Sequence, residues 1–170
     1  MMCGITGTPG TGKSSVGTEL SRRGHTVIRL ADSVRPYVIG ADKERDTELI
    51  DVDRWIEEFV PVDGFIEGHF VHLLPCDQIV VLRCRPDVLK TRLALRNYPE
   101  KKIRENVQSE ALDTCLIETV EMYEPGQILE LDATTRDAMY CADQIERFVN
   151  GEIPASFGTL DWSEFLEVQE

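Results

Sequence analysis

The stretch Gly7-Thr8-Pro9-Gly10-Thr11-Gly12-Lys13-Ser14 decides the fold of this chain. It follows the apolar run of residues 1–6 and precedes a segment with helical spacing, so a strand, a loop and a helix are predicted in succession. The spacing fits G-x-x-x-x-G-K-[ST], in which glycines let backbone N–H groups turn inward around an anion. The first turn of the helix adds further unpaired N–H groups. The sequence therefore predicts a loop that binds the phosphates of a nucleotide.

Two side chains at the end of this loop complete the predicted phosphate site. Lys13 supplies a mobile positive charge for the β- and γ-phosphates, and the Ser14 hydroxyl suits Mg²⁺. The alternative is an ordinary glycine-rich turn before a helix, which the complete strand–loop–helix context disfavours. We therefore expect ATP and Mg²⁺ at this loop.

Composition indicates one globular domain over residues 1–170. The chain is 42% hydrophobic and 29% charged, and its net charge of −13 argues against a broad basic surface for nucleic acid. The five cysteines are scattered, without a C-x-x-C pair, and most lie in apolar runs, which predicts buried thiols in a reducing compartment. The N-terminal residues lack a signal-peptide pattern and no apolar run approaches transmembrane length, so we expect a cytoplasmic protein without a membrane partner.

Strand-like and helix-like segments alternate along the rest of the chain. After the first strand, further strands are predicted at residues 25–30, 64–67, 78–83 and 127–132. Helices are predicted at residues 14–23, 31–39, 51–59, 87–96, 101–123 and 137–150, with a loop at 40–47 and a break at 97–99. This alternation predicts an α/β fold with a parallel sheet of about five strands and helices on both faces.

The tail of residues 152–170 carries several large apolar side chains. We expect it to pack back on the core, and an apolar surface for a partner is the alternative.

Glu67 ends a predicted strand and is followed by Gly68 and His69. Ligands of a parallel sheet lie at the carboxyl ends of its strands, where the phosphate loop also lies. A carboxylate there can hold Mg²⁺ through water or orient an attacking group, and a surface acid is the alternative. His69 and His72 could also form a zinc pair, but no third ligand is evident.

Arg92 and Arg96 lie four residues apart on one predicted helix, and Lys101 and Lys102 follow the break. Phosphoryl transfer spreads negative charge over the moving group, and arginine and lysine stabilise that charge. The segment is therefore a candidate lid over the phosphates. From charge spacing alone, a solvated basic helix face is the stronger interpretation.

Arg35, together with Asp32, is a candidate clamp for the phosphate of an acceptor, because guanidinium matches phosphate oxygens bidentately. Arg35 alone is weak evidence for such a clamp. Its position after the second predicted strand, on the same side of the sheet as the phosphate loop, supports it. The acids Asp46, Asp51 and Asp53 form either a solvated face, which we favour, or a contact to a base or ribose.

These motifs combine into a family resemblance. They are residues 7–15, Leu30-Ala31-Asp32-Ser33-Val34-Arg35, Glu67-Gly68-His69, Arg92-Leu93-x-x-Arg96-Asn97-Tyr98 and Lys101-Lys102-Ile103-x-x-Asn106. In them the chain resembles adenylate kinase isoenzyme 6, the coilin-interacting nuclear ATPase family, and most closely its archaeal members. The resemblance covers residues 1–150. It implies a P-loop NTPase fold of the nucleoside-monophosphate-kinase type, with an acceptor-binding segment at about residues 28–50 and a small lid at about residues 95–105.

The resemblance also implies substrates and residue roles. ATP is the family's donor, AMP its favoured acceptor and Mg²⁺ its metal; members also hydrolyse ATP and assist maturation of the small ribosomal subunit, and the eukaryotic relatives are nuclear. With the motifs, it predicts ATP binding by Gly7, Gly10, Thr11, Gly12, Lys13, Ser14, Ser15, Arg96 and Thr135. Acceptor binding is predicted for Asp32, Arg35 and Gly68. The predicted catalytic residues are Lys13, Glu67, His69, Arg92 and Arg96, and the predicted metal ligands are Ser14 and Glu67.

The chain departs from the family pattern at three places. Glu67 replaces the usual aspartate and its longer arm could shift the metal geometry, whereas Asn97 replaces a glycine and tolerates left-handed angles. The loop of residues 40–47 matches poorly, which leaves the choice of acceptor open.

Two functions of different classes follow. The first is a kinase that moves the γ-phosphoryl of ATP to AMP, or to another small acceptor. The second is a nucleotide-switched ATPase that assembles the small ribosomal subunit, binding a ribosomal protein and the pre-ribosomal particle. An acidic surface would suit basic ribosomal proteins.

Overall fold

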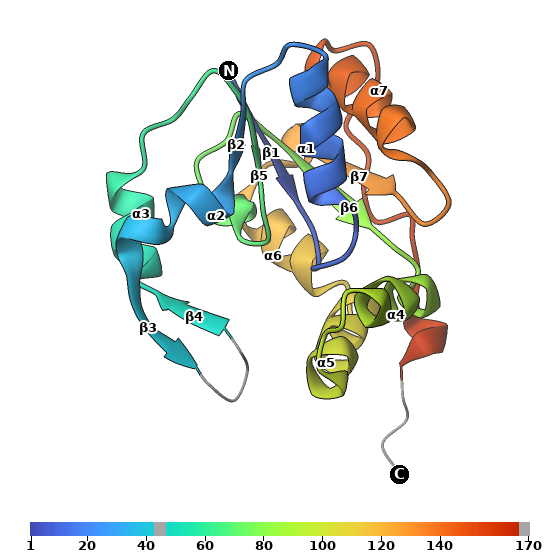
Figure 1. Ribbon diagram of the computed structural model, residues 1–170. Coiled ribbons are helices and arrows are strands. Elements are labelled where there is room, and N and C mark those ends of the chain that lie inside the picture. Colours follow the sequence, from blue (N-terminus) through green and yellow to red (C-terminus); the bar gives the residue numbers. More distant parts are fainter. Residues whose placement is uncertain (43–46, 167–170) are drawn as a thin grey trace.

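The computed structural model describes residues 1–42 and 47–166 and builds them around one parallel sheet (Figure 1). The sheet has the order β2-β5-β1-β6-β7, and each neighbouring pair is parallel. Its strands are β1 (Met2–Thr6), β2 (Val27–Arg29), β5 (Gly64–Glu67), β6 (Gln78–Arg83) and β7 (Ile128–Asp132). β1 and β6 are almost wholly buried, because helices cover both faces, and this explains their continuous apolar runs. The predicted five-stranded parallel sheet is confirmed.

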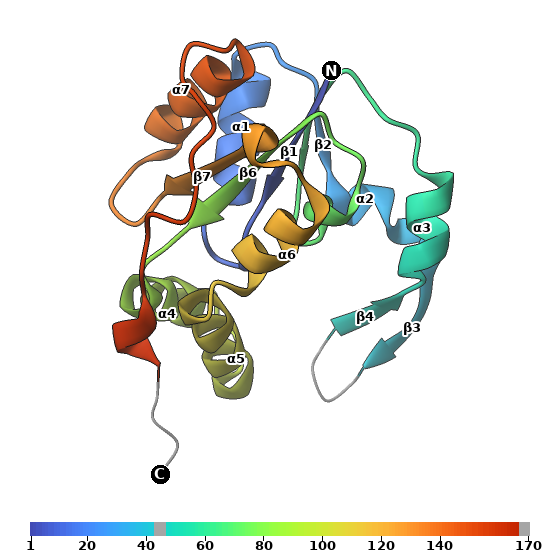
Figure 2. The same ribbon diagram turned by 180° about the vertical axis from the view of Figure 1, so that it is seen from behind.

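Helices pack on both faces of the sheet (Figures 1 and 2). α1 (Lys13–Arg22) and α7 (Ala138–Val149) cover one face, where Leu20 and Phe148 belong to the same buried cluster. α6 (Thr114–Met122) covers the other face and shares a second cluster with α3 (Val52–Glu58). The predicted layers are therefore confirmed.

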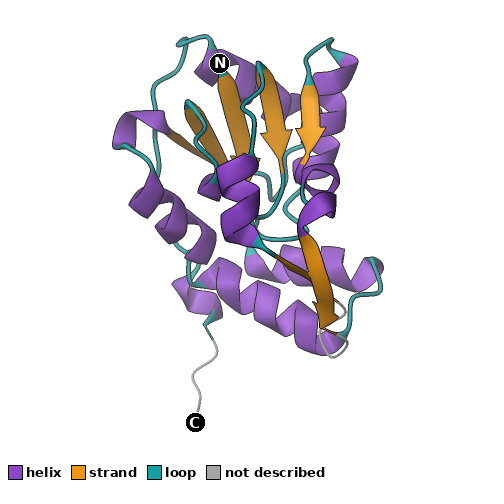
Figure 3. Cartoon of the chain, turned by 90° about the vertical axis from the view of Figure 1, so that its left-hand side faces the viewer, coloured by secondary structure: helices purple, strands orange, loops and turns teal. Residues whose placement is uncertain are grey.

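Two appendages lie past the carboxyl ends of the sheet strands. On one side are α4 (Pro86–Leu95) and α5 (Glu100–Ala111), and on the other is a hairpin of β3 (Val38–Asp42) and β4 (Thr47–Ile50) (Figures 1 and 3). The turn between α4 and α5 contains Asn97, whose φ of 56° is the left-handed conformation that the sequence analysis expected it to tolerate. The phosphate loop therefore lies between two structures that can border a ligand.

The prediction of one helix over residues 101–123 is wrong. α5 ends at Ala111 and α6 begins at Thr114. Asp113, between them, has a left-handed φ of 56°, and its carboxylate pairs with the buried side chain of Arg83. A buried cation needs carboxylate partners, and this demand outweighs the helical pattern of the sequence.

The predictions for residues 25–47 also need correction. The second strand starts at Val27, and the predicted helix over residues 31–39 is a single turn, α2 (Leu30–Ser33), followed by a 3₁₀ turn at Arg35–Tyr37. Pro36 explains why α2 does not continue, because proline has no backbone N–H to donate to the carbonyl four residues earlier. Residues 40–42 and 47, predicted as loop, belong to β3 and β4; residues 43–46, including Asp46, lie outside the described residues.

The described part of the tail packs on the core, as expected. The Ser156 N–H donates to the Ile128 carbonyl at 3.0 Å, and the Ser156 carbonyl accepts from the Glu130 N–H at 2.7 Å. Phe157 packs against the core cluster shared by α3 and α6, and a turn at Ser163–Phe165 contacts α5. Residues 167–170 lie outside the described part.

The five cysteines are all buried thiols, as predicted. Among residues 1–42 and 47–166, none of the helices has the length and hydropathy of a membrane span.

Candidate active site

The loop between β1 and α1 has the backbone that anion binding requires. Gly7 has φ +143°, and a Cβ there would lie 2.4 Å from the Leu82 carbonyl oxygen, so only glycine fits. Gly12, with φ +112°, is the N-cap residue of α1 and has no side chain that could accept from the helix N–H groups. The N–H groups of the first turn of α1 therefore remain for an anion.

Lys13 bends back over this loop. Its buried ammonium donates to the carbonyls of Gly7, at 2.6 Å, and Thr8, at 2.9 Å. Burial lowers the pKa of Lys13 to about 8, although nearby acidic groups, including Glu67, act in the opposite direction. A phosphate beside the ammonium would favour the charged form, so anion binding and protonation of Lys13 are coupled.

Ser14 and Glu67 form an oxygen pair beside Lys13. The Ser14 hydroxyl donates to Glu67 Oε2 across 3.4 Å, and Glu67 is buried at the carboxyl end of β5. A hydroxyl and a carboxylate are ligands of the kind that Mg²⁺ takes while keeping several waters. The two residues thus fit the predicted metal site.

His69 and His72 have separate surroundings. His69 Nδ1 lies 3.4 Å from the Gly7 carbonyl, and burial together with the Lys13 charge lowers its pKa to about 4. The ring is therefore neutral at pH 7 and can orient a water or a hydroxyl. His72 contacts Thr6 Oγ1 through Nδ1, at 2.9 Å, and Glu118 through Nε2, at 3.1 Å.

Arg92 and Arg96 both reach the surroundings of the loop. Arg92 donates to the Thr11 carbonyl at 3.4 Å and to the carbonyls of Ala133 and Thr134 at 2.9 and 3.0 Å. It therefore joins α4 to the phosphate loop and to the segment after β7. Arg96 follows α4 and lines the cavities on both sides of the loop.

Two cavities meet at the phosphate loop. The first, of about 190 Å³, lies among the loop, α4 and the start of α7, and Arg136 lines it. The second, of about 460 Å³, is lined by Lys13, Ser14, Glu67, Gly68, His69, Tyr98 and Arg29. Gly10, Gly12 and Arg96 line both cavities. The arrangement gives one set of phosphate-binding groups two neighbouring spaces.

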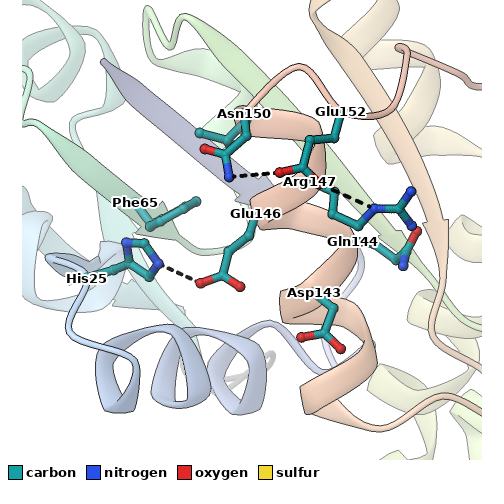
Figure 4. A pocket seen from close by; sticks show the side chains of 9 residues that line it. His25, Phe65, Asp143, Gln144, Glu146, Arg147, Asn150 and Glu152 are labelled. Atoms are coloured by element: carbon teal, nitrogen blue, oxygen red, sulfur yellow. Dashed lines mark hydrogen bonds and ion pairs between the residues drawn. The ribbon is translucent and has the colours of Figure 1, made fainter.

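A hollow of about 610 Å³ lies away from this loop, between His25 and α7 (Figure 4). Its charged side chains are ion-paired: His25 with Glu146 at 2.7 Å and Arg147 with Glu152 at 3.7 Å (Figure 4). Asp143 pairs with Arg23, outside the lining, at 2.6 Å. These groups satisfy each other, so the hollow does not compete with the phosphate loop as the candidate site.

The structure brings together most of the predicted site residues, but not all. Asp32 and Arg35 form an ion pair at 3.6 Å, their side chains are 62% and 79% exposed, and neither lines the two cavities. Thr135 is exposed and also lies outside both linings. Their nucleotide contacts stay predictions. Asp51 caps α3 by accepting from the Arg54 N–H at 3.2 Å.

Arg29 and Arg136 are cavity residues that the sequence analysis missed. Arg29 ends β2 in register with Glu67, which ends β5. Arg29, like Glu67, is a polar side chain at the carboxyl end of a parallel strand, and this position alone predicts that it borders the ligand. Arg136 follows β7 by a few residues and lies in a segment without a motif.

Known proteins resemble the chain in both sequence and fold. The family described as AAA domain matches residues 3–113. Proteins named "Putative adenylate kinase" are similar over nearly the full length. The one from Natronomonas pharaonis is 38% identical, over 98% of this chain and all of that protein. The one from Archaeoglobus fulgidus is 36% identical, over 98% of this chain and 94% of that protein. Among solved structures, the YorR protein of Bacillus subtilis in complex with phosphorylated GDP has a TM-score of 0.60 at 16% identity, covering 89% of this chain and 97% of that one. This last likeness concerns the fold.

Proposed function

The chain belongs to the AAA-domain family and to the group of archaeal proteins named "Putative adenylate kinase", and on that premise we propose that it is an ATP-dependent kinase of nucleoside monophosphates, with AMP as acceptor. The observation that carries the proposal is the pair of cavities that share Gly10, Gly12 and Arg96. A kinase with two nucleotide substrates needs two spaces that meet where the phosphoryl group moves.

In this proposal the phosphates of ATP lie in the loop and its adenosine in the first cavity. The N–H groups of the loop and of α1 hold the β- and γ-phosphates, and Lys13 exchanges the carbonyls of Gly7 and Thr8 for phosphate oxygens. Arg92 holds α4 against this cavity through main-chain carbonyls. Arg96 faces the transferred group from the turn after α4 and stabilises its charge.

Ser14 and Glu67 would hold Mg²⁺ at the same place. The ion would supply positive charge beside the transferred phosphoryl group, where negative charge develops.

The acceptor occupies the second cavity, with Arg29 as the cation for its phosphate. The phosphate of AMP is already an anion at neutral pH, so its attack requires no general base. What the chain must supply is charge neutralisation between two anionic nucleotides and exclusion of water. Arg29, Lys13 and Arg96 line this cavity and neutralise the charge of the two nucleotides. The segment that joins α4 to α5 borders the same cavity through Tyr98 and would exclude water from it.

The test is ADP release measured with an acceptor panel and a control without acceptor. Lys13→Ala and Arg96→Ala should each abolish ADP formation from ATP and AMP. Lys90→Ala removes an exposed cation of α4 that lines neither cavity, and it should leave the rate unchanged. A normal yield of ADP from Lys13→Ala or Arg96→Ala would refute the proposal.

ATP hydrolysis is a second activity that one observation favours. His69 is neutral and lies at the phosphate loop, where it can orient a water when the acceptor is absent. Phosphate release without acceptor should then be measurable in the wild type and fall at least tenfold in His69→Ala. A rate that does not change in this variant would remove His69 from hydrolysis.

The role in ribosome assembly, with its ribosomal partners, stays a prediction of the sequence. A pull-down with small-subunit ribosomal proteins, with and without ATP, would test it.

A further inference from the structure

Glu110 is a buried carboxylate to which the proposed reaction gives no task. It lies in the last turn of α5 and is 1% exposed. Its Oε1 accepts from Arg83 Nε at 2.8 Å and from the Cys84 N–H at 3.0 Å. Its Oε2 accepts from the Thr8 hydroxyl at 2.5 Å. One carboxylate thus joins α5, the end of β6 and the phosphate loop.

Arg83 binds the Glu110 oxygen that does not contact Thr8. The guanidinium is 1% exposed and pairs with Glu110, with Glu130 at 2.5 Å and with Asp113. Burial by itself would lower the pKa of Arg83, but the carboxylates of Glu110 and Asp113 more than offset it and the pKa is raised. A charged fork with fixed partners leaves the Glu110 carboxylate little freedom to turn.

Thr8 connects Glu110 to Lys13 and to the rest of the phosphate loop. Its side chain is buried, and its carbonyl accepts from Lys13 Nζ at 2.9 Å and from Thr11 Oγ1 at 2.9 Å. The hydroxyl that Glu110 holds and the carbonyl that orients Lys13 therefore belong to the same residue. Any turn of Thr8 moves both.

We propose that Glu110 is a positioning residue for the phosphate loop. It holds Thr8 so that the backbone of the loop is preorganised for a triphosphate, and it does so from the helix that follows the candidate lid. The affinity for ATP then depends on a carboxylate that touches no nucleotide. The inference rests on the proposed function only as far as ATP binding.

The chain contains a matched control for the structural part of this role. Glu130 also pairs with Arg83, and its side chain is as deeply buried as that of Glu110. Its second oxygen accepts from the Thr159 N–H at 3.0 Å, in the tail, instead of from the loop. Glu110→Gln and Glu130→Gln therefore remove the same kind of charge from the same arginine, and only Glu110→Gln weakens the hold on Thr8.

The experiment measures the Kd for Mg·ATP by calorimetry and the thermal unfolding midpoint of four single variants. Thr8→Val keeps the shape but removes the hydroxyl and should raise the Kd about tenfold, while Thr8→Ser should bring it back to within about threefold of the wild type. Glu110→Gln should raise the Kd at least about threefold. Glu130→Gln should lower the midpoint by a similar amount to Glu110→Gln and leave the Kd within about twofold.

The double variant Thr8→Val/Glu110→Gln completes the cycle. Both substitutions remove the same hydrogen bond, from the Thr8 hydroxyl to Glu110. The Kd of the double variant should therefore be close to that of Thr8→Val alone, and not increased by the product of the two single fold-changes. Additive effects, an unchanged Kd in Thr8→Val, or an equal rise in Glu130→Gln would overturn the inference. Wild-type protein that binds Mg·ATP but transfers phosphoryl to no acceptor would refute the proposed kinase and leave this measurement standing.

Discussion

The affinity for ATP should fall as pH rises above 8, because the Lys13 ammonium must be charged to bind phosphate. Burial lowers the pKa of Lys13 from 10.5 to about 8. Bound phosphate favours the ammonium, so the pKa in the complex is higher and binding above pH 8 takes up a proton. Below pH 8 the ammonium is already present, and this group gives no pH dependence there.

The size of the effect follows from the same pKa. Each pH unit above 8 leaves about one tenth as much protein with a charged lysine, so the Kd should rise about elevenfold at pH 9 and about thirtyfold at pH 9.5. Calorimetry in two buffers of different ionisation enthalpy should show uptake of close to one proton at pH 9.5 and much less at pH 7.5.

Lys13→Arg is the control for this prediction. Its guanidinium stays charged throughout the range, so its Kd, whatever its value at pH 7.5, should not show the rise above pH 8. A wild-type Kd that is flat from pH 7.5 to 9.5, or a rise that persists in Lys13→Arg, would refute the coupling.

Three further predictions concern other parts of the chain. Arg29→Ala should raise the KM for AMP about tenfold and leave the KM for ATP near that of the wild type, whereas Arg35→Ala should change the KM for AMP less; steady-state ADP release checks both. Trp55→Ala empties a side-chain site that is 1% exposed and should cost about 3–5 kcal/mol of unfolding free energy in urea titration. Arg22 and Arg23 lower the pKa of Glu19 to about 2, so its stabilising effect is present above the unfolded pKa of 4.5 and is lost as pH falls toward 2; Glu19→Gln should flatten this acid limb of the unfolding free energy.

The sequence was sufficient to predict the sheet, and it named the residues that the structure brings together around the phosphate loop. The spacing from Gly7 to Ser14 has a local mechanism, because each residue type is required by the backbone or by a phosphate, and buried strands such as β6 give continuous apolar runs. Glu67 could be placed because strand ends in a parallel sheet converge.

What could not be predicted depends on partners distant in sequence. The end of α5 is set by a buried arginine 30 residues earlier, since Arg83 draws the Asp113 carboxylate away from the helical path. Glu110 reads in the sequence as one more acid on a charged helix, because its partner Thr8 is 102 residues away. Arg29 depends on no such distant partner: it lies near the end of the second predicted strand, whereas Arg35 was predicted as the acceptor cation because it follows that strand.

The pairing of Ser156 with β7 has a consequence for how the chain behaves in solution. Without the tail, the Ile128 carbonyl and the Glu130 N–H of the edge strand β7 would have no backbone partner. Unpaired edge strands can pair with strands of other molecules, which leads to aggregation. The segment around Ser156 that pairs with this edge lies outside residues 3–113, the part that matches the AAA-domain family. A chain that ends just before this segment would keep every nucleotide-binding group described above and still expose the edge of β7, so we expect it to aggregate.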